Sequence, residues 1–316
     1  MKPKVVFLVG PTAIGKSGIS VKLAQKIKAG IISCDSMQIY KGMDIITSKP
    51  KPAARRKIQH HLIDIISPTQ EYDVSRYCQV ALRKIKEVLK KDEIPLFVGG
   101  TGLYMSILVD GIFKAKAQNK IIRKRLYREA EQLGSSHLYK KLQVVDPEAA
   151  FKIHPHDTKR IIRALEVFEA CGRPISQLQK ERRSLFDEYE VKIFCLNMAR
   201  DKLYQKIDHR VDKMFNQGLT DEVKKLLKLK LSKTASCAIG IRELKGYLDG
   251  LYDLEEAKRL IKKNTRNYAK RQLTWFRKDK RVEWVEVGEK NTPSAIANKI
   301  IKKLNLHNAR RITQNA

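Results

Sequence analysis

Residues 5–17 read VVFLVGPTAIGKS, and this stretch decides the fold. Its first five residues form a short apolar run that ends at a Gly-Pro pair. After the Gly-Lys-Ser end, apolar side chains recur at helical spacing, at Ile19, Leu23, Ala24 and Ile27. The stretch therefore predicts a buried strand, a loop and a helix. Residues 10–17 also match G-x-x-x-x-G-K-[ST], and the flanking strand and helix are the context that makes this pattern specific.

The loop of residues 10–17 is suited to bind phosphate. Backbone N–H groups of such a loop and of the helix N-terminus can hold phosphate oxygens, while Lys16 adds positive charge and Ser17 can ligate Mg²⁺. A purely structural Gly-rich turn is the alternative, but it gives Lys16 no function. We expect phosphate contacts from eight residues, which are Gly10, Pro11, Thr12, Ala13, Ile14, Gly15, Lys16 and Ser17.

Two more apolar runs, residues 31–34 and 94–98, are separated by an amphipathic helical pattern at residues 74–89. Short apolar strands that alternate with helices are typical of a parallel sheet covered on both faces. The predicted fold class is therefore α/β, with a P-loop NTPase-like parallel sheet flanked by helices. Ligands of such sheets bind at the carboxyl ends of the strands.

The pattern changes after Asp110-Gly111. Strand-like runs disappear, and helical segments rich in Lys and Arg occupy residues 120–133 and 157–171. This predicts an inserted, mostly helical domain at residues 115–190, between two parts of the core at residues 1–114 and 191–316. In the second part we expect a strand at 191–196, helices near 201–216, 219–229 and 236–248, a long helix at 254–278, a strand at 282–287 and a frayed end from His307.

Composition restricts the class of function. The 316 residues include 65 Lys and Arg against 34 Asp and Glu, and the net charge of +31 calls for a polyanionic partner, with nucleic acid as the first choice. The length excludes a single small module, and a hydrophobic share of 42% excludes wholesale disorder.

The sequence favours a cytoplasmic protein without a membrane partner. Its five cysteines lie far apart and form no C-x-x-C pair, so we expect them to be reduced. The apolar run at residues 5–9 is shorter than the core of a signal peptide. No stretch reaches the ~20 apolar residues of a membrane span.

Polar residues follow the second and third predicted strands at the edge that holds the phosphate loop. Asp35 could accept a proton or hold a metal there, although an Asp-Ser turn or cap is the alternative. The glycines of residues 99–102 permit close backbone approach, and Thr101 offers a hydroxyl or a helix cap. His60 and His61 precede a strand predicted at residues 62–64, and we expect no metal shared between them.

Residues 259–281 hold ten basic residues against one acid, Asp279. One helical stripe carries four of these cations, Lys263, Arg266, Lys270 and Arg277. Apolar residues that can face the core lie on another stripe, namely Leu260, Ala269, Leu273 and Phe276. A solvated face is the alternative, but this organised bias favours contact with a phosphate backbone. The basic runs at residues 120–128 and 159–163 could extend that surface.

In combination, these segments resemble the tRNA dimethylallyltransferase (tRNA isopentenyltransferase) family of bacterial type. The likeness covers almost the whole chain. The matching segments are residues 10–17, 33–36 with Gln38 and Tyr40, 42–45, Lys49-Pro50, 60–64, 99–104, Asp157 with Arg160 and 163–166, 238–240, Thr265-Arg266 and 269–275.

The resemblance implies transfer of a dimethylallyl group from dimethylallyl diphosphate to N6 of the adenosine at position 37 of tRNA, 3′ of the anticodon. The products would be N6-(dimethylallyl)adenosine and diphosphate. Thr12, Gly15, Lys16 and Ser17 would bind the diphosphate with Mg²⁺, although the motif alone suggests ATP. Asp35 would contact the tRNA and act as the general base, with Lys16 and Thr12 also catalytic.

The resemblance also implies contacts with the anticodon stem-loop of tRNA. On the core these are Ser36, Met37, Gln38 and Thr101. On the insertion they are Arg123, Lys159, Arg160, Ile161, Ile162 and Arg163. The basic stripe itself, and not the resemblance, adds Lys263, Arg266 and Lys270. We expect a monomer.

Four positions depart from the family pattern. Met37 stands where Arg is frequent, His156 where Asn is usual, and Ile241-Arg242 where Tyr-Lys is usual. The first departure changes the side chain at a position that the resemblance assigns to a tRNA contact. The others would change the protein surface that faces the tRNA. Eukaryotic relatives have an additional C-terminal zinc finger, for which this chain lacks the cysteines.

From the residues alone, two other functions stay open. A small-metabolite P-loop kinase would use Asp35 to activate a hydroxyl while a γ-phosphate moves. A nucleic-acid-binding ATPase would perform no transfer to its partner. The kinase leaves the basic residues of 259–281 without a function.

Overall fold

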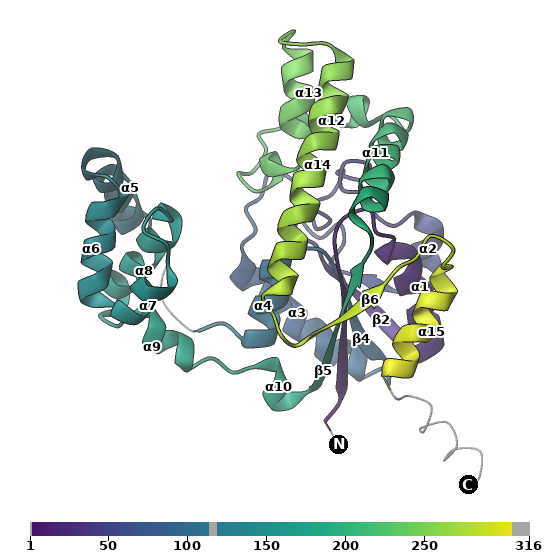
Figure 1. Cartoon of the computed structure of the whole chain (residues 1–316), viewed down its shortest axis with the longest axis horizontal. Coiled ribbons are helices and arrows are strands. Elements are labelled where there is room, and N and C mark those ends of the chain that lie inside the picture. Colours follow the sequence, from purple (N-terminus) through teal and green to yellow (C-terminus); the bar gives the residue numbers. More distant parts are fainter. Residues whose placement is uncertain (1, 114–118, 305–316) are drawn as a thin grey trace. The chain divides into compact units, whose positions relative to one another are not determined.

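The structure is a computed structural model, and it describes residues 2–113 and 119–304 (Figure 1). The chain forms two compact units, one from Met1–Val109 with Glu188–Ala316 and one from Asp110–Asp187. The frayed end predicted from His307 lies outside the described residues. Among the helices that are described, none is long and apolar enough to cross a bilayer.

The larger unit is built on six parallel strands in the order β3-β2-β4-β1-β5-β6. Their bounds are Lys4–Val9 (β1), Ala29–Cys34 (β2), His60–His61 (β3), Ile94–Gly99 (β4), Glu190–Asn197 (β5) and Val282–Glu286 (β6). β1 lies in the middle, and its residues Val5 to Leu8 are fully buried because the sheet is covered on both faces. The predicted α/β class with a parallel sheet is confirmed.

Helices pack on this sheet and gather beyond the carboxyl ends of its strands. α1 (Lys16–Ile27) packs against α15 (Pro293–Lys303), and their apolar faces share one hydrophobic core with β1. In Figure 1 the strands point toward α11 (Arg200–Asn216), α12 (Leu219–Leu227), α13 (Ile241–Leu248) and α14 (Leu254–Arg277). The other helices of this unit are α2 (Pro52–Lys57), α3 (Val74–Leu89) and α4 (Gly102–Asp110), which ends at its border, whereas α10 (Leu185–Glu188) lies in the smaller unit up to Asp187.

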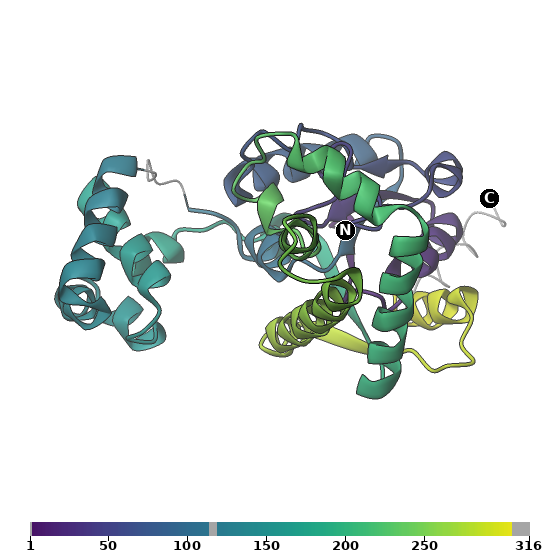
Figure 2. The same cartoon turned by 90° about the horizontal axis from the view of Figure 1, so that it is seen from above.

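The described residues of the smaller unit form helices joined by loops, without a strand (Figure 2). Its helices are α5 (Lys120–Leu133), α6 (Ser135–Val145), α7 (Pro147–Lys152), α8 (Thr158–Cys171) and α9 (Ile175–Lys180). They enclose a core of their own that includes Leu126, Leu138, Leu142 and Leu165. The side chain of Asp157 caps α8 by accepting a hydrogen bond from the Arg160 N–H.

Two predicted elements differ from the structure. The helix expected at 236–248 is divided into a 3₁₀ turn at Ala235–Cys237 and α13, because Gly240 with a φ of 113° interrupts it. The strand expected at residues 62–64 is wrong: β3 consists of the two histidines before it. Leu62 and Asp64 have φ angles of 62° and 58°, in the left-handed region where a strand cannot continue.

Candidate functional site

The phosphate loop joins β1 to α1 through three residues with positive φ, Gly10 (145°), Ala13 (65°) and Gly15 (103°). A Cβ at Gly10 would lie 3.0 Å from the carbonyl oxygen of Leu196 on β5, so this close approach requires glycine. Pro11 and Ile14 are buried and can offer only backbone atoms to a ligand. Ser17 is exposed in the first turn of α1, where backbone N–H groups favour anions.

Lys16 lies at the bottom of this loop. Its Nζ donates hydrogen bonds of 2.8 Å to the carbonyl oxygens of Gly10 and Pro11. Burial lowers the pKa of Lys16 to about 8, although the carboxylate of Asp35 acts in the opposite direction. Because desolvation disfavours the ammonium ion, a bound anion would restore the charged form.

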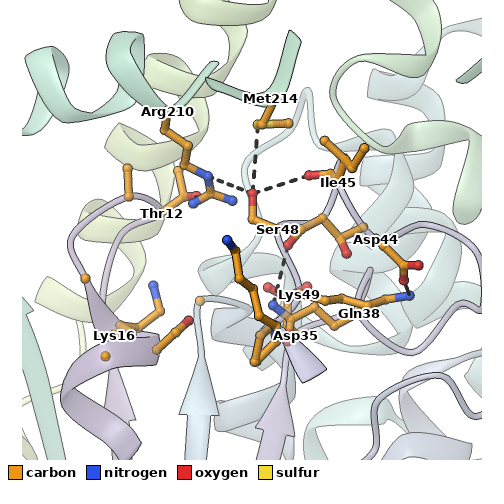
Figure 3. Close-up of a pocket in the computed structure, with 18 of the residues that line it drawn as sticks. Thr12, Lys16, Asp35, Gln38, Asp44, Ile45, Ser48, Lys49, Arg210 and Met214 are labelled. Atoms are coloured by element: carbon orange, nitrogen blue, oxygen red, sulfur yellow. Dashed lines mark hydrogen bonds and ion pairs between the residues drawn. The ribbon is translucent and has the colours of Figure 1, made fainter. Parts of the chain in front are cut away.

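Arg210 reaches the loop from α11, although it was not among the site residues predicted from the sequence. Its Nη1 donates to Thr12 Oγ1 and its Nε donates to Ser48 Oγ, each at 2.8 Å (Figure 3). Burial lowers its pKa, an effect that nearby Asp35 opposes. Arg210 lies three residues after Ile207 and directly before Val211, which are both buried. Its position beside this apolar stripe of the helix is the feature of the sequence that could have indicated a role in the site.

Asp35 lies half-buried just after β2, and its Oδ1 accepts the N–H of Met37 at 2.9 Å. The next residue along, Ser36, donates its N–H to Thr101 Oγ1 at 3.0 Å. Gln38 is held within its own segment, because its Oε1 accepts from Ser33 Oγ at 3.2 Å. The structure therefore brings the predicted residues after β2 and β4 to the edge that holds Thr12 and Lys16.

Two cavities meet at this edge. The larger, about 660 Å³, is lined by charged and polar groups that include Lys16, Ser17, Lys49 and Lys213. The smaller, about 260 Å³, has apolar walls that include Ile46, Val211, Ile239 and Ile261, and it also contains Ser36 and Met37. Six residues line both cavities, namely Thr12, Asp35, Thr47, Arg210, Met214 and Tyr268. The first cavity therefore offers mainly charged and polar groups and the second offers a largely apolar wall, with Asp35 lining both.

The outer wall of the larger cavity is held by Lys49, whose side chain is only 2% exposed. Its Nζ donates to the Tyr40 carbonyl oxygen at 2.6 Å and to Oδ1 of Asp44 and Asp64 at 2.7 and 2.5 Å. Burial raises the pKa of Asp64, but hydrogen bonds from Lys49 and Arg55 outweigh it and bring the pKa below its ordinary value. Lys49 is therefore a structural cation of this wall.

A metal at this site would take few ligands from the protein. Among residues 2–113 and 119–304, no group of three or more His, Cys, Asp or Glu side chains is placed to hold an ion. The exposed Ser17 hydroxyl beside the larger cavity suits Mg²⁺, which commonly takes its remaining ligands from substrate phosphates and water.

The predicted basic stripe of α14 divides into exposed and paired residues. Lys263, Lys270 and Arg277 are exposed, whereas Arg266 Nη1 binds both carboxylate oxygens of Asp208, at 2.7 and 2.8 Å. The face of α14 toward the core carries buried Ala257, Ile261, Ala269, Gln272 and Phe276, while Leu260 and Leu273 are half-buried.

The residues predicted to contact tRNA from the insertion also divide. Lys159 and Arg160 are exposed, but Ile161 and Ile162 are buried in the core of the smaller unit, so neither side chain is available to RNA. Arg123 and Arg163 both bind the fully buried carboxylate of Glu166, at 2.7 and 3.1 Å. Among the four departures from the family pattern, His156 and Arg242 are exposed, Met37 is half-buried and Ile241 is buried.

Known proteins are similar to this chain over most of its length. A family model described as IPP transferase matches residues 38–279. The chain belongs to this family. Among its members, the tRNA dimethylallyltransferase of Natranaerobius thermophilus is 47% identical over 302 residues, 94% of this chain and 90% of that protein. The tRNA dimethylallyltransferase of Carboxydothermus hydrogenoformans is 45% identical, over 98% of this chain and 99% of its own length.

Solved structures of IPP transferases have the same fold. The full-length tRNA isopentenylpyrophosphate transferase of Bacillus halodurans superposes with a TM-score of 0.69 at 39% identity, over 96% of this chain and 97% of that one. A eukaryotic dimethylallyltransferase captured acting on tRNA superposes with a TM-score of 0.81 at 29% identity, over 95% of this chain and 80% of that one.

Proposed function

We propose that this enzyme transfers a dimethylallyl group from dimethylallyl diphosphate to N6 of adenosine 37 in tRNA. One observation carries the proposal beyond the family: a cationic and an apolar cavity share a wall that contains Asp35, Thr12 and Arg210. A transferase needs such a junction, because the donor carbon and the acceptor nitrogen must meet while the rest of each substrate stays apart.

The larger cavity would hold the diphosphate. Lys16, Arg210 and the N–H groups of the phosphate loop would neutralise the charge that grows on diphosphate as it leaves. Mg²⁺, held by Ser17 and the phosphate oxygens, would add positive charge there when bound.

The smaller cavity would receive the adenine. N6 is a poor nucleophile because its lone pair is delocalised into the ring, so a base must take its proton as the new bond forms. The N6–C1 bond forms, the C1–O bond to diphosphate breaks with its electron pair, and the N6 proton passes to a carboxylate oxygen of Asp35. The Thr12 hydroxyl, fixed by Arg210, lies at the same junction and would orient N6.

Basic surfaces would hold the rest of the anticodon stem-loop. A base stacked in that loop cannot reach a cavity at a sheet edge, so it must be extruded. We assign phosphate contacts on the core to Lys263 and Lys270, and on the helical insertion to Lys159 and Arg160, because these cations are exposed. The insertion is then a tRNA-contacting domain of a monomeric enzyme that works where tRNA is used, in the cytoplasm.

In the test, the protein is incubated with unmodified tRNA and either dimethylallyl diphosphate or ATP. The masses of the nucleosides are then measured by mass spectrometry. We expect a dimethylallyl adduct of adenosine with the first donor alone. Phosphorylation with ATP would support the kinase, and ATP hydrolysis without any adduct would support the ATPase.

A further inference from the structure

The glycine run after β4 is a docking surface for α14. A Cβ on Gly100 would lie 2.1 Å from Gln272 Nε2, and a Cβ on Gly102 would lie 2.3 Å from the Trp275 ring. Trp275 also donates from Nε1 to Ser106 Oγ at 3.1 Å. These glycines are therefore required because two side chains of one helix occupy the space that their own side chains would fill.

Gln272 passes between the two loops of the sheet edge and bonds to both. Its Oε1 accepts the Thr12 N–H at 2.8 Å, and its Nε2 donates to the Gly100 carbonyl oxygen at 2.8 Å. The residue is only 6% exposed. Because one end of the amide accepts and the other donates, these two bonds fix its orientation as well as its position.

Thr12 is the residue that this amide immobilises. Its N–H is bound to Gln272, its Oγ1 accepts from Arg210, and it lines both cavities. A hydroxyl that accepts a hydrogen bond from arginine can still donate its proton, so its direction at the junction depends on the Thr12 backbone. That backbone belongs to a loop with several positive φ angles, and the bond from Gln272 is made directly to its N–H.

We propose that Gln272 is a positioning residue of the transfer step and acts through Thr12. The inference rests on the proposed function. Gln272 holds the Thr12 hydroxyl at the point where donor and acceptor meet, and its contribution is to the geometry of the reacting atoms. The helix that supplies this amide also carries Lys263 and Lys270, so one element both contacts the RNA and sets the reaction centre.

The experiment is a double-mutant cycle with Gln272→Ala, Thr12→Ala and the double variant, measured with saturating tRNA and dimethylallyl diphosphate. Because a displacement of about 1 Å at a reacting group can cost ~10²-fold, we expect Gln272→Ala to lower kcat by roughly 10- to 100-fold. The KM for dimethylallyl diphosphate and the Kd for tRNA should change by less than about threefold.

The double variant decides whether the effect passes through Thr12. If it does, the double variant is no slower than Thr12→Ala alone, since groups that act as a unit are not additive. Losses that multiply, or a loss that appears only in KM or Kd, would overturn the proposal. Thr274→Ala is the matched control, because Thr274 is exposed on the same helix and its Oγ1 donates to the carbonyl oxygen of Lys270 in that helix.

A second variant tests the same idea without altering Gln272. Gly100→Ala places a methyl group 2.1 Å from Nε2 and must displace the amide, so it should reproduce the kcat loss of Gln272→Ala. If Gln272→Ala fails to fold, Gly100→Ala decides the question, and wild-type kcat in that variant refutes the proposal. A wild-type enzyme that makes no adduct would instead refute the proposed function.

Discussion

The donor end of the site and the basic surface proposed for RNA are built in opposite ways. At the donor end, Lys16 and Arg210 are partly buried and each donates to two fixed acceptors. On the surface proposed for RNA, Lys263 and Lys270 are exposed, and two neighbouring cations, Lys262 and Arg266, are bound to acids. A cation that is fixed in a cavity affects the bound substrate through its exact position. Exposed cations each add a small contribution to RNA binding, so their number matters more than the position of any one. Substitutions at the donor end should therefore have large and specific effects, and those on the surface small and salt-dependent ones.

Asp35→Asn should have the largest effect. General-base assistance is worth about 10²- to 10⁴-fold, and we expect a loss in that range, confined to single-turnover rates, with both substrates still bound. The amide oxygen of Asn can still accept the Met37 N–H, so loss of the turn does not explain slow turnover. Recovery at high Mg²⁺ would make Asp35 a metal ligand, and near-normal rates would remove the base from the mechanism.

Lys16→Ala should come next. Hydrogen bonds to charged groups contribute roughly 1.5–3 kcal/mol, so the affinity for dimethylallyl diphosphate should fall about 10- to 100-fold. The affinity for tRNA should stay nearly normal, because Lys16 lines the larger cavity and not the smaller one. Filter binding of tRNA beside competition with inorganic diphosphate measures both quantities. Equal losses for the two substrates would contradict the division between the cavities.

Raising the pH should weaken the use of dimethylallyl diphosphate by the wild-type protein, as Lys16→Ala does but to a smaller extent. Lys16 has a pKa of about 8, so its ammonium form dominates below that pH and disappears above it. We expect kcat/KM for dimethylallyl diphosphate to decline as the pH rises through about 8, because this parameter reports the free enzyme. Lys16→Arg keeps its charge and should remove the decline. A decline that persists in Lys16→Arg would assign it to another group.

Glu166→Gln tests whether buried charge on the insertion serves its structure. Glu166 is fully buried and holds Arg123, Arg163 and the Asn119 N–H. Leaving such buried groups with incomplete partners lowers the stability of the insertion by about 1–3 kcal/mol. The amide hydrogens of α5 and α8 should therefore exchange faster, while those of β1 are unaffected. Glu169→Gln is the matched control, since that carboxylate binds Arg125 but is partly exposed. Equal effects in both variants would remove the special role of burial.

Single substitutions on the stripe of α14 should give the smallest effects. Each phosphate contact contributes about 0.7–0.9 to the slope of log affinity for tRNA against log salt. Lys263→Ala and Lys270→Ala should each flatten the slope by roughly one contact. Arg266→Ala should change it less, because Arg266 already binds Asp208. An unchanged slope in both lysine variants would make the stripe a solvated face.

Local patterns predicted the parts of the fold that depend on neighbours in the chain. Residues 5–17 are strand, loop and helix as expected, and the long helix expected at 254–278 is α14. The contacts that complete the site join distant positions: Arg210 reaches Thr12, and Gln272 reaches Thr12 and Gly100. No spacing rule connects residues so far apart, because only the packing of α11 and α14 on the sheet edge brings them together.

The same reason limits what the sequence shows of the basic surfaces, whose tRNA contacts stay predictions. Arg123 and Arg266 bind acids on other helices, Glu166 of α8 and Asp208 of α11, and the spacing along the chain does not show these pairs. Arg163 instead binds Glu166 three residues further along the same helix. The resemblance assigns tRNA contacts to all five residues of 159–163. In a helix, however, some of these five side chains must face the core. Ile161 and Ile162 face the core, as their apolar character would have indicated.

The register of the central strand also sets the order of events during synthesis. Lys4 of β1 pairs with Glu190 of β5, so β1 emerges from the ribosome long before one of its two neighbours exists. At roughly 5–20 residues per second the delay is on the order of 10–40 s. The helical insertion is made within that interval and has its own core of local contacts. We therefore expect the insertion to fold first, while the unfinished sheet exposes an apolar edge that attracts chaperones.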